Sequence, residues 1–384
     1  MSHSQYRQSR DVSSFHQLAL RTASRSDARI DVLSISALNY DHIYSVDRIE
    51  PDHEVASYKT TSAAGGSGAN TAVALSLLGA TTAIAGIVAD DEKGRLLRQS
   101  LDKAGVDSSQ IITSTSARGA TGEAIVFAAR IRNGGRMIVV NPGVNNEFAA
   151  AVRTTDRLEP LKNAARSARI VHLSSFAGSG ERELQGKIVN SLSDDVVVSL
   201  NPGQLYALLG VEEVAPIMAR ADIVFFYETH LDALVGASGS SLEMGSGEWL
   251  SERLRKLGEK LQRLEGRSPS VFVIKRSWSS DEAHFLVMSD RCGERHHYCS
   301  ARVGAGLNTT IDATGAGDAM AAGTLFALLR GAQTRDTVDF AYVMAMCASA
   351  SLGARAGLPV HADIEERWRE HMHGLREPPS ILIN

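Results

Sequence analysis

The feature that most constrains the fold is an alternation of short apolar runs with longer stretches of helical periodicity. The apolar runs are rich in β-branched residues and have few polar positions, which is typical of strands covered on both faces. Strands and helices that alternate along one chain favour a doubly wound α/β fold, with a mostly parallel sheet and helices on both faces. The expected strands cover residues 31–35, 82–88, 169–173, 196–200, 222–226 and 271–274.

The stretches between these strands carry apolar residues at helical spacing. Leu250, Leu254, Leu257 and Leu261 recur every three or four residues, so that one side of a helix can bury all of them. Some of these stretches end at a glycine, which is a common helix stop. The expected helices cover residues 69–78, 91–103, 248–264, 318–329 and 337–352.

Two stretches, 43–61 and 122–140, break this alternation and have the pattern of half-buried strands. In the second stretch, residues 124–131 and 137–140 flank the turn-forming sequence Asn133-Gly134-Gly135, which favours a β-hairpin. Strands of this kind inside a doubly wound chain indicate a small sheet that projects from the main body as a lid.

Composition and charge narrow the choice of partners. The 384 residues carry 40 basic and 44 acidic side chains, and the net charge of −4 gives no general attraction to nucleic acid or to an acidic membrane. No apolar run reaches the ~20 residues of a membrane span. Three cysteines in so long a chain argue against a disulfide framework and indicate a reducing compartment. We therefore expect a cytoplasmic protein that acts on a small molecule.

Residues 1–30 differ from the rest of the chain because they are polar, rich in serine and more basic than acidic. Organelle transit peptides share this composition, and residues 16–21 could form a short amphipathic turn. Since chain ends are commonly loose, we expect a disordered extension over 1–30 and one folded domain over 31–384.

The strongest local motif is IDATGAGDAMAAGTLFALL, in which Gly315, Ala316, Gly317 and Asp318 lead into an alanine-rich helix. Backbone N–H groups at a glycine-rich helix N-terminus can hold negative charge. A carboxylate beside such an anion hole suits phosphoryl transfer to an alcohol, because it can accept the hydroxyl proton while the N–H groups stabilise the phosphoryl charge. Taken alone, the motif is equally typical of an ordinary helix start that uses Asp318 as its N-terminal acid.

The second motif, AAGGSGANTAVALSLLGA, spans residues 63–80. Two glycines flank Ser67 as in a dinucleotide-binding turn, but Thr71 stands where that fingerprint has its third glycine, and the preceding segment is polar. We therefore favour a site where the backbone near Gly66 approaches a small polar ligand. Asn70 can both donate and accept hydrogen bonds to such a ligand.

The third motif is SALNYDHI, which directly follows the first expected strand. Asn39 and Asp41 are two residues apart, so an extended chain points both side chains to one side. Parallel sheets bind ligands at the carboxyl ends of their strands, where this pair could hold vicinal hydroxyl groups. An ordinary polar turn with Asp41 as a cap would have the same pattern.

Together, the motifs and their order resemble the ribokinase-like (PfkB) carbohydrate kinase family, and within it the ribokinases. GGSGAN resembles the first signature of that family, and DATGAGDAMAAGTLFALL resembles the second. The resemblance extends over residues 31–361 and implies an ATP-dependent kinase that phosphorylates an alcohol group of a sugar. Furanoses such as ribose come first, because Asn39 and Asp41 suit an acceptor with free hydroxyl groups.

The resemblance also implies a role for each matching position. Asp318 would be the catalytic base, and Gly315, Ala316 and Gly317 would form the anion hole. Asp312 matches a position that helps bind a monovalent cation such as K⁺ in several members. The positions that would hold the acceptor are Asn39, Asp41, Gly66, Ser67 and Asn70.

The chain departs from the family pattern around the expected nucleotide site. Tyr227 and His230 replace both ends of an N-x-x-E motif that organises Mg²⁺ and phosphate, so we expect Glu228 to take over that role. Lys275 and Ser277 stand at the ends of a segment that is usually T-x-G, where cationic side chains can contact phosphate.

Two other functions stay open at this point. A nucleoside kinase on the same fold would use the same motifs, and a non-catalytic sugar sensor would explain the loss of N-x-x-E. In each case the partner is a small molecule, and we expect a homodimer because a lid sheet with an apolar outer face commonly pairs with its copy.

Overall fold

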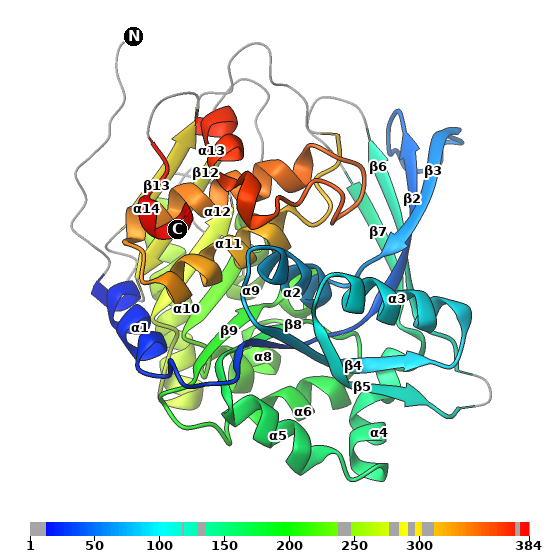
Figure 1. Ribbon diagram of the computed structural model, residues 1–384, viewed down its shortest axis with the longest axis horizontal. Helices are drawn as coiled ribbons and strands as arrows, with labels where there is room; N and C mark the ends of the chain where they lie inside the picture. The colour runs from blue at the N-terminus through cyan, green and yellow to red at the C-terminus, as the bar shows by residue number, and fades with distance from the viewer. Residues whose placement is uncertain are drawn as a thin grey trace.

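A computed structural model describes residues 13–116, 119–129, 136–236, 247–275, 284–290, 296–301, 311–372 and 377–383. It shows a doubly wound α/β body and a separate small sheet at one edge (Figure 1). The nine strands of the main sheet lie in the order β13-β12-β11-β10-β9-β8-β1-β4-β5.

Seven neighbouring strands of this sheet, from β5 to β11, run parallel. All six strands expected from the apolar runs are confirmed. The seventh, β5, escaped the sequence analysis because six of the eight residues of this edge strand are polar. The parallel strands are β1 (Ile30–Ile35), β4 (Thr82–Ala89), β5 (Asp107–Ser114), β8 (Ala168–Ser174), β9 (Val197–Asn201), β10 (Ile223–Tyr227) and β11 (Val271–Lys275). Two antiparallel strands, β12 (His284–Asp290) and β13 (His296–Ala301), extend the sheet beyond β11.

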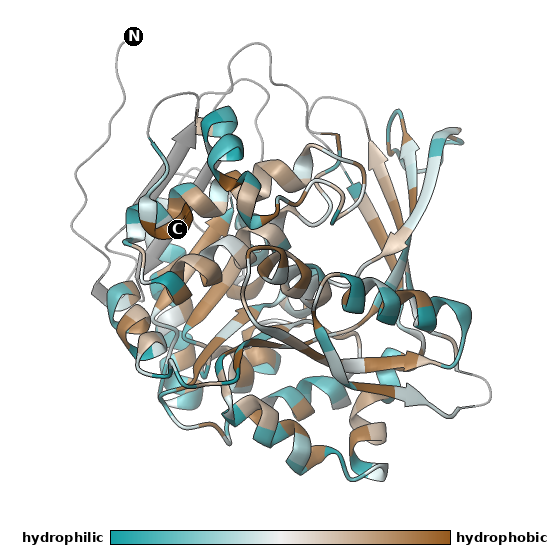
Figure 2. Cartoon of the chain, in the orientation of Figure 1, coloured by the Kyte–Doolittle hydropathy of each residue, from teal (hydrophilic) through white to brown (hydrophobic). Residues whose placement is uncertain are grey.

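Successive residues of the parallel strands contribute to two separate cores. Val32 packs with the helices on one face of the sheet, whereas Leu33 packs with those on the other face. Figure 2 shows these inner strands as apolar and the outer sides of the covering helices as polar.

Helices cover both faces of the sheet, as expected. On the Val32 face lie α1 (Ser13–Ala23), α2 (Ser67–Leu77), α11 (Ala316–Arg330), α12 (Thr334–Ser349), α13 (Ile364–Met372) and α14 (Ser380–Ile383). On the Leu33 face lie α4 (Phe148–Thr154), α5 (Leu158–Arg166), α6 (Ser179–Val189), α7 (Gly203–Ala207), α8 (Val211–Met218), α9 (Glu228–Val235) and α10 (Gly247–Glu265). Helix α3 (Glu92–Lys103) packs with α2 and β4 in a third cluster.

The small sheet contains the segments that broke the strand and helix alternation. We call it the lid; its strand order is β3-β2-β6-β7. Strands β6 and β7 form the expected antiparallel pair, while the turn residues 133–135 lie outside the described part of the chain. The bounds of the lid strands are β2 (Asn39–Val46), β3 (Ser57–Ala64), β6 (Gly122–Ala129) and β7 (Arg136–Asn141).

The expected disorder of residues 1–30 is wrong for residues 13–30. Helix α1 occupies Ser13–Ala23, and it buries Phe15, Leu18 and Ala19 in the core beside α11. These three apolar residues have helical spacing, so they share one face of α1, and folding buries that face against the core. Residues 1–12 lie outside the described chain. Among the described helices, none is both long and apolar enough to cross a membrane.

Candidate active site

The N-terminus of α11 forms the base of the candidate site. Gly315 caps this helix with φ of 79°, and a Cβ atom there would lie 2.5 Å from Cβ of Ala354. A Cβ atom on Gly317 would lie 3.0 Å from the hydroxyl oxygen of Tyr227. Glycine suits both positions, because Gly315 takes a left-handed conformation and Gly317 has no room for a side chain. Without these two side chains, the backbone N–H groups of the first turn are accessible to an anion.

Asp318 lies in this first turn and meets the N-terminus of α2. Its Oδ1 accepts a hydrogen bond from the Ser67 hydroxyl at 2.6 Å, and its Oδ2 accepts one from Nδ2 of Asn70 at 2.9 Å. The side-chain nitrogen of Asn201, at the end of β9, lies 3.4 Å from Oδ1. Burial raises the pKa of Asp318 above its ordinary value, although the bonds from Ser67 and Asn70 act in the opposite direction.

Asp41 supplies a second buried carboxylate from lid strand β2. Its side chain packs against the backbone of Gly65, where a Cβ atom would lie 2.1 Å from Oδ2. The next residue, Gly66, has φ of 96°, and a Cβ atom there would lie 2.6 Å from the carbonyl oxygen of Ala37. Burial raises the pKa of Asp41 to about 7, and the nearby Arg355 guanidinium offsets part of this effect.

Asn39 begins β2 and is held by a residue that the sequence analysis missed. Nδ2 of the buried Asn145 donates to Oδ1 of Asn39 at 3.0 Å and to the carbonyl oxygen of Leu38 at 2.9 Å. Oδ1 of Asn145 accepts from the Leu38 N–H. The structure thus places the first turn of α2 and Asp41 near Asp318, and Asn39 adjoins them through its carbonyl oxygen, which accepts from the Gly65 N–H.

A group of cations lies beside the Gly315–Asp318 turn. Tyr227 and Lys275 end neighbouring strands β10 and β11 in register, and Nζ of Lys275 lies 5.5 Å from the centre of the tyrosine ring. Arg136 of β7 reaches across from the lid: Nη1 donates to the carbonyl oxygen of Ala313 at 2.8 Å, and Nη2 donates to the Tyr227 hydroxyl at 3.5 Å. Burial alone would raise the pKa of Tyr227, but Lys275 and Arg136 outweigh it and lower this pKa.

The structure explains what Tyr227 and His230 do in place of N-x-x-E. The two rings pack edge to face, with 5.0 Å between their centres. The Tyr227 N–H donates to Nδ1 of His230 at 3.5 Å, so the pair caps the N-terminus of α9. Burial lowers the pKa of His230 to about 4, which keeps it neutral. Glu228 is buried in the first turn of α9. Ser277 lies outside the described residues.

Asp312 is buried just before the α11 turn. Its Oδ1 accepts from the Thr314 N–H, and its Oδ2 accepts from the Gly353 N–H, both at 2.9 Å. The Thr314 hydroxyl is buried and has no hydrogen-bond partner within the described chain. A carboxylate with a free hydroxyl beside it is an oxygen-rich environment of the kind that hard cations prefer.

Arg355, in the loop after α12, is the largest omission of the sequence analysis. Its three nitrogen atoms donate to Oδ1 of Asn70 at 2.8 Å, to the Ser100 hydroxyl at 3.0 Å and to the carbonyl oxygen of Gly65 at 3.1 Å. Nothing in the local sequence marks a single loop arginine, because its partners lie about 250 to 290 positions away along the chain.

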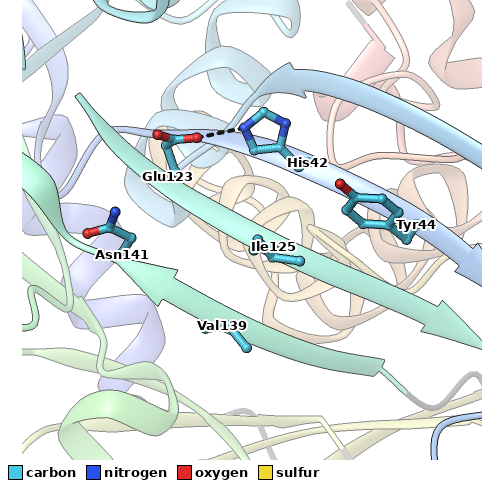
Figure 3. A pocket seen from close by; sticks show the side chains of 6 residues that line it. All are labelled: His42, Tyr44, Glu123, Ile125, Val139 and Asn141. Atoms are coloured by element: carbon cyan, nitrogen blue, oxygen red, sulfur yellow. Dashed lines mark hydrogen bonds and ion pairs between the residues drawn. The ribbon is translucent and has the colours of Figure 1, made fainter. Parts of the chain in front are cut away.

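A cavity of about 250 Å³ lies on the other face of the lid (Figure 3). Residues from β2, β6 and β7 line it, and Nε2 of His42 lies 2.7 Å from Oε2 of Glu123 at one end. Because side chains alternate along a strand, His42 points away from the side that carries Asp41. This cavity is therefore separate from the candidate active site.

The fold and this site define a class of proteins, the ribokinase-like kinases. A solved structure of Arabidopsis thaliana ribokinase, complexed with ribose and ATP, superposes on 88% of this chain and 99% of its own, with a TM-score of 0.66 at 21% identity. A family model described as pfkB family carbohydrate kinase matches residues 29–361. The chain belongs to this family, so it is a phosphotransferase of the sugar and nucleoside kinase type.

Two curated relatives align with this chain over nearly their whole lengths. An uncharacterized sugar kinase of Archaeoglobus fulgidus is 27% identical over 75% of this chain and 99% of its own. A nucleoside kinase of Methanothermobacter thermautotrophicus is 24% identical over 88% of this chain and 95% of its own.

Proposed function

We propose that the protein transfers the terminal phosphoryl group of ATP to a hydroxyl group of a furanose sugar, with ribose as the first candidate. The observation that carries the proposal is the position of Asp318, between the α11 turn and the Ser67 and Asn70 side chains of α2. A carboxylate at this point faces the developing charge on one side and the acceptor on the other.

Asp318 accepts the proton of the acceptor hydroxyl in this mechanism. The hydroxyl oxygen forms a bond to the terminal phosphorus of ATP while the bond from that phosphorus to the leaving oxygen of ADP breaks, and the proton on Asp318 then passes to solvent. The amides of Gly315, Ala316 and Gly317 stabilise the negative charge on the moving group. The raised pKa of Asp318 makes it a stronger base than an exposed aspartate.

The acceptor would lie against Asn39, Asp41, Gly66, Ser67 and Asn70. Ser67 and Asn70 already donate to Asp318, so they hold the base as well as bordering the acceptor. Asp41 accepts hydrogen bonds from hydroxyl groups when it is ionised. A lid strand thus supplies an acceptor ligand, and closure of the lid would exclude water from the reaction.

The polyphosphate would lie beside Lys275 and Arg136. The charged groups of these two side chains lie 5.5 Å and 5.8 Å from the centre of the Tyr227 ring. Two cations next to an anion-binding turn suit a phosphoryl group, and they compensate for the missing N-x-x-E motif. Glu228 is the acid we assign to Mg²⁺, which when bound neutralises phosphate charge. Ser277 follows Lys275 closely enough in sequence to contribute to the same site.

Asp312 and Thr314 would hold the monovalent cation, which we take to be K⁺. The buried Thr314 hydroxyl without a partner supports this assignment, since a buried polar atom normally finds a ligand. When bound, the cation adds positive charge behind the anion-binding turn.

A nucleoside is the second candidate acceptor, and it is favoured by the match to a relative named nucleoside kinase along 88% of the chain. Initial rates of ADP formation with ribose, other pentoses, hexoses and nucleosides decide between the two. We expect ribose to give the highest kcat/KM. A higher value for a nucleoside would reverse the order, and sugar binding without ATP binding in calorimetry would favour the sensor.

A further inference from the structure

We propose that Arg355 is a positioning residue for the phosphoryl transfer: it turns the Asn70 amide toward Asp318 and holds the Gly65 backbone under Asp41. This inference rests on the proposed function of Asp318 as base. It adds a residue that lies outside every motif of the sequence and reaches the site from the loop after α12.

The two hydrogen-bond partners of the Asn70 side chain fix the orientation of its amide. An arginine has only donors, so the Asn70 atom 2.8 Å from Nε of Arg355 must be the side-chain oxygen. The amide nitrogen then faces Oδ2 of Asp318 at 2.9 Å, and an ionised carboxylate has only acceptors. Both neighbours therefore select the same orientation of the amide, and Arg355 prevents it from turning away from the base.

The second contact of Arg355 acts on Asp41. Nη2 donates to the carbonyl oxygen of Gly65, and the Gly65 backbone lies directly against the Asp41 carboxylate. The third contact, from Nη1 to the Ser100 hydroxyl, fixes the guanidinium to α3. One side chain thus connects α3, the turn before α2 and the Asn70 amide, so its loss should loosen the acceptor side of the site.

Arg355 also balances charge in a site that holds several buried carboxylates. Its positive charge lowers the pKa of both Asp41 and Asp318, against the larger effect of burial. Removing the guanidinium should therefore move the acid limb of the activity profile to higher pH. The other charged groups that face Asp41 or Asp318 are Asp312, Arg136, Lys275 and Tyr227.

Two substitutions of Arg355 test the proposal: one removes both the charge and the hydrogen bonds, and the other removes hydrogen bonds but keeps the charge. Arg355→Met removes both the charge and the bonds, and we expect kcat/KM to fall about 10- to 100-fold, as for loss of charged hydrogen bonds. We expect its acid limb to move up by about one pH unit. Arg355→Lys keeps the charge but cannot make all three bonds, so its acid limb should stay near the native pH while kcat falls.

Arg98→Met is the matched control. Arg98 is also a half-buried arginine, and it donates to the carbonyl oxygens of Ser108 and Ile111 and to the Thr113 hydroxyl, away from the acceptor. If arginine loss acts only through stability, Arg98→Met and Arg355→Met should lower the melting temperature alike and leave the pH profile unmoved. That result would overturn the proposal.

A double variant tests whether Arg355 acts through Asn70. In an Asn70→Ala background, Arg355→Met should reduce kcat much less than it does in the native protein, because the amide it orients is gone. Fully additive losses in kcat would contradict the inference. If the native protein phosphorylates no acceptor, the proposed function itself is wrong and the inference falls with it.

Discussion

Two buried carboxylates, Asp41 and Asp318, lie in the candidate active site but have different neighbours. Asp318 receives hydrogen bonds from Ser67 and Asn70, which support it as a base. Asp41 packs on Gly65 and has a pKa of about 7, far above its ordinary value of 3.8. At the residue scale, the two acids therefore suit the two roles that we propose for them: Asp318 would accept a proton during the reaction, and Asp41 would bind hydroxyl groups once it is ionised.

The pKa of Asp41 predicts how activity depends on pH. Because only the ionised carboxylate is a pure acceptor, kcat/KM for the sugar should rise as the pH passes through about 7. Asp41→Asn should weaken the acceptor interaction and remove this limb. A pH profile of kcat/KM checks it, and an Asp41→Asn variant that keeps the native limb would assign the titration to another group.

The same carboxyl predicts a stability difference with a definite sign. Between about pH 4 and pH 7, the folded protein holds a proton on Asp41 that the unfolded chain has released. The native protein therefore loses stability relative to Asp41→Asn as the pH rises through this window. Thermal unfolding of both proteins at pH 5 and pH 8 measures this change: the melting temperature of the native protein minus that of Asp41→Asn should be lower at pH 8 than at pH 5. A difference that stays constant or increases would contradict the raised pKa of Asp41.

At the scale of the element, α11 carries the site at one end only. Both of its caps are glycines with positive φ, Gly315 at 79° and Gly331 at 72°. The space around them differs, since a Cβ atom on Gly315 would collide with Ala354, whereas nothing lies within 4 Å of one on Gly331. The N-terminal glycine is therefore required by packing as well as by backbone geometry.

This difference gives a matched pair of substitutions. Gly331→Ala should lower the free energy of unfolding by about 1 to 2 kcal/mol, which is the cost of the left-handed conformation alone. Gly315→Ala should cost more and should also lower kcat, because Ala354 must move and Arg355 lies next to it. Denaturant unfolding and initial rates check both effects, and equal stability losses with unchanged kcat would show that the α11 turn has no part in catalysis.

At the scale of the whole molecule, the sequence predicted what is local and missed what is assembled from distant segments. The buried strands and the GAG turn were visible because apolar runs and glycines carry their own signal. Arg355, Asn145 and Asn201 reach the site only through the fold, and no neighbouring residues mark them. Helix α1 was missed because a basic, serine-rich segment hides the spacing of Phe15 and Leu18.

Substitutions on the two faces of the lid can test whether the protein forms the expected homodimer. Val139 and Ile138 are neighbours on β7 and are 51% and 42% exposed, but alternation places them on opposite faces of the lid. If the outer face, which carries Val139, pairs with its copy, Val139→Glu should give a monomer in sedimentation equilibrium, and Ile138→Glu should stay a dimer. A native protein that is monomeric at micromolar concentration would rule out the homodimer.

The most direct test of the account compares ADP formation by the native protein with that of Asp318→Asn, using the best acceptor. We expect kcat of the variant to fall by at least about 1,000-fold, because both base catalysis and the ionised carboxylate are lost. Acceptor affinity in calorimetry should stay within a few fold, and the exposed Asp27→Asn should be as active as the native protein. An Asp318→Asn variant that turns over within about tenfold of the native rate would show that this carboxylate is not the base.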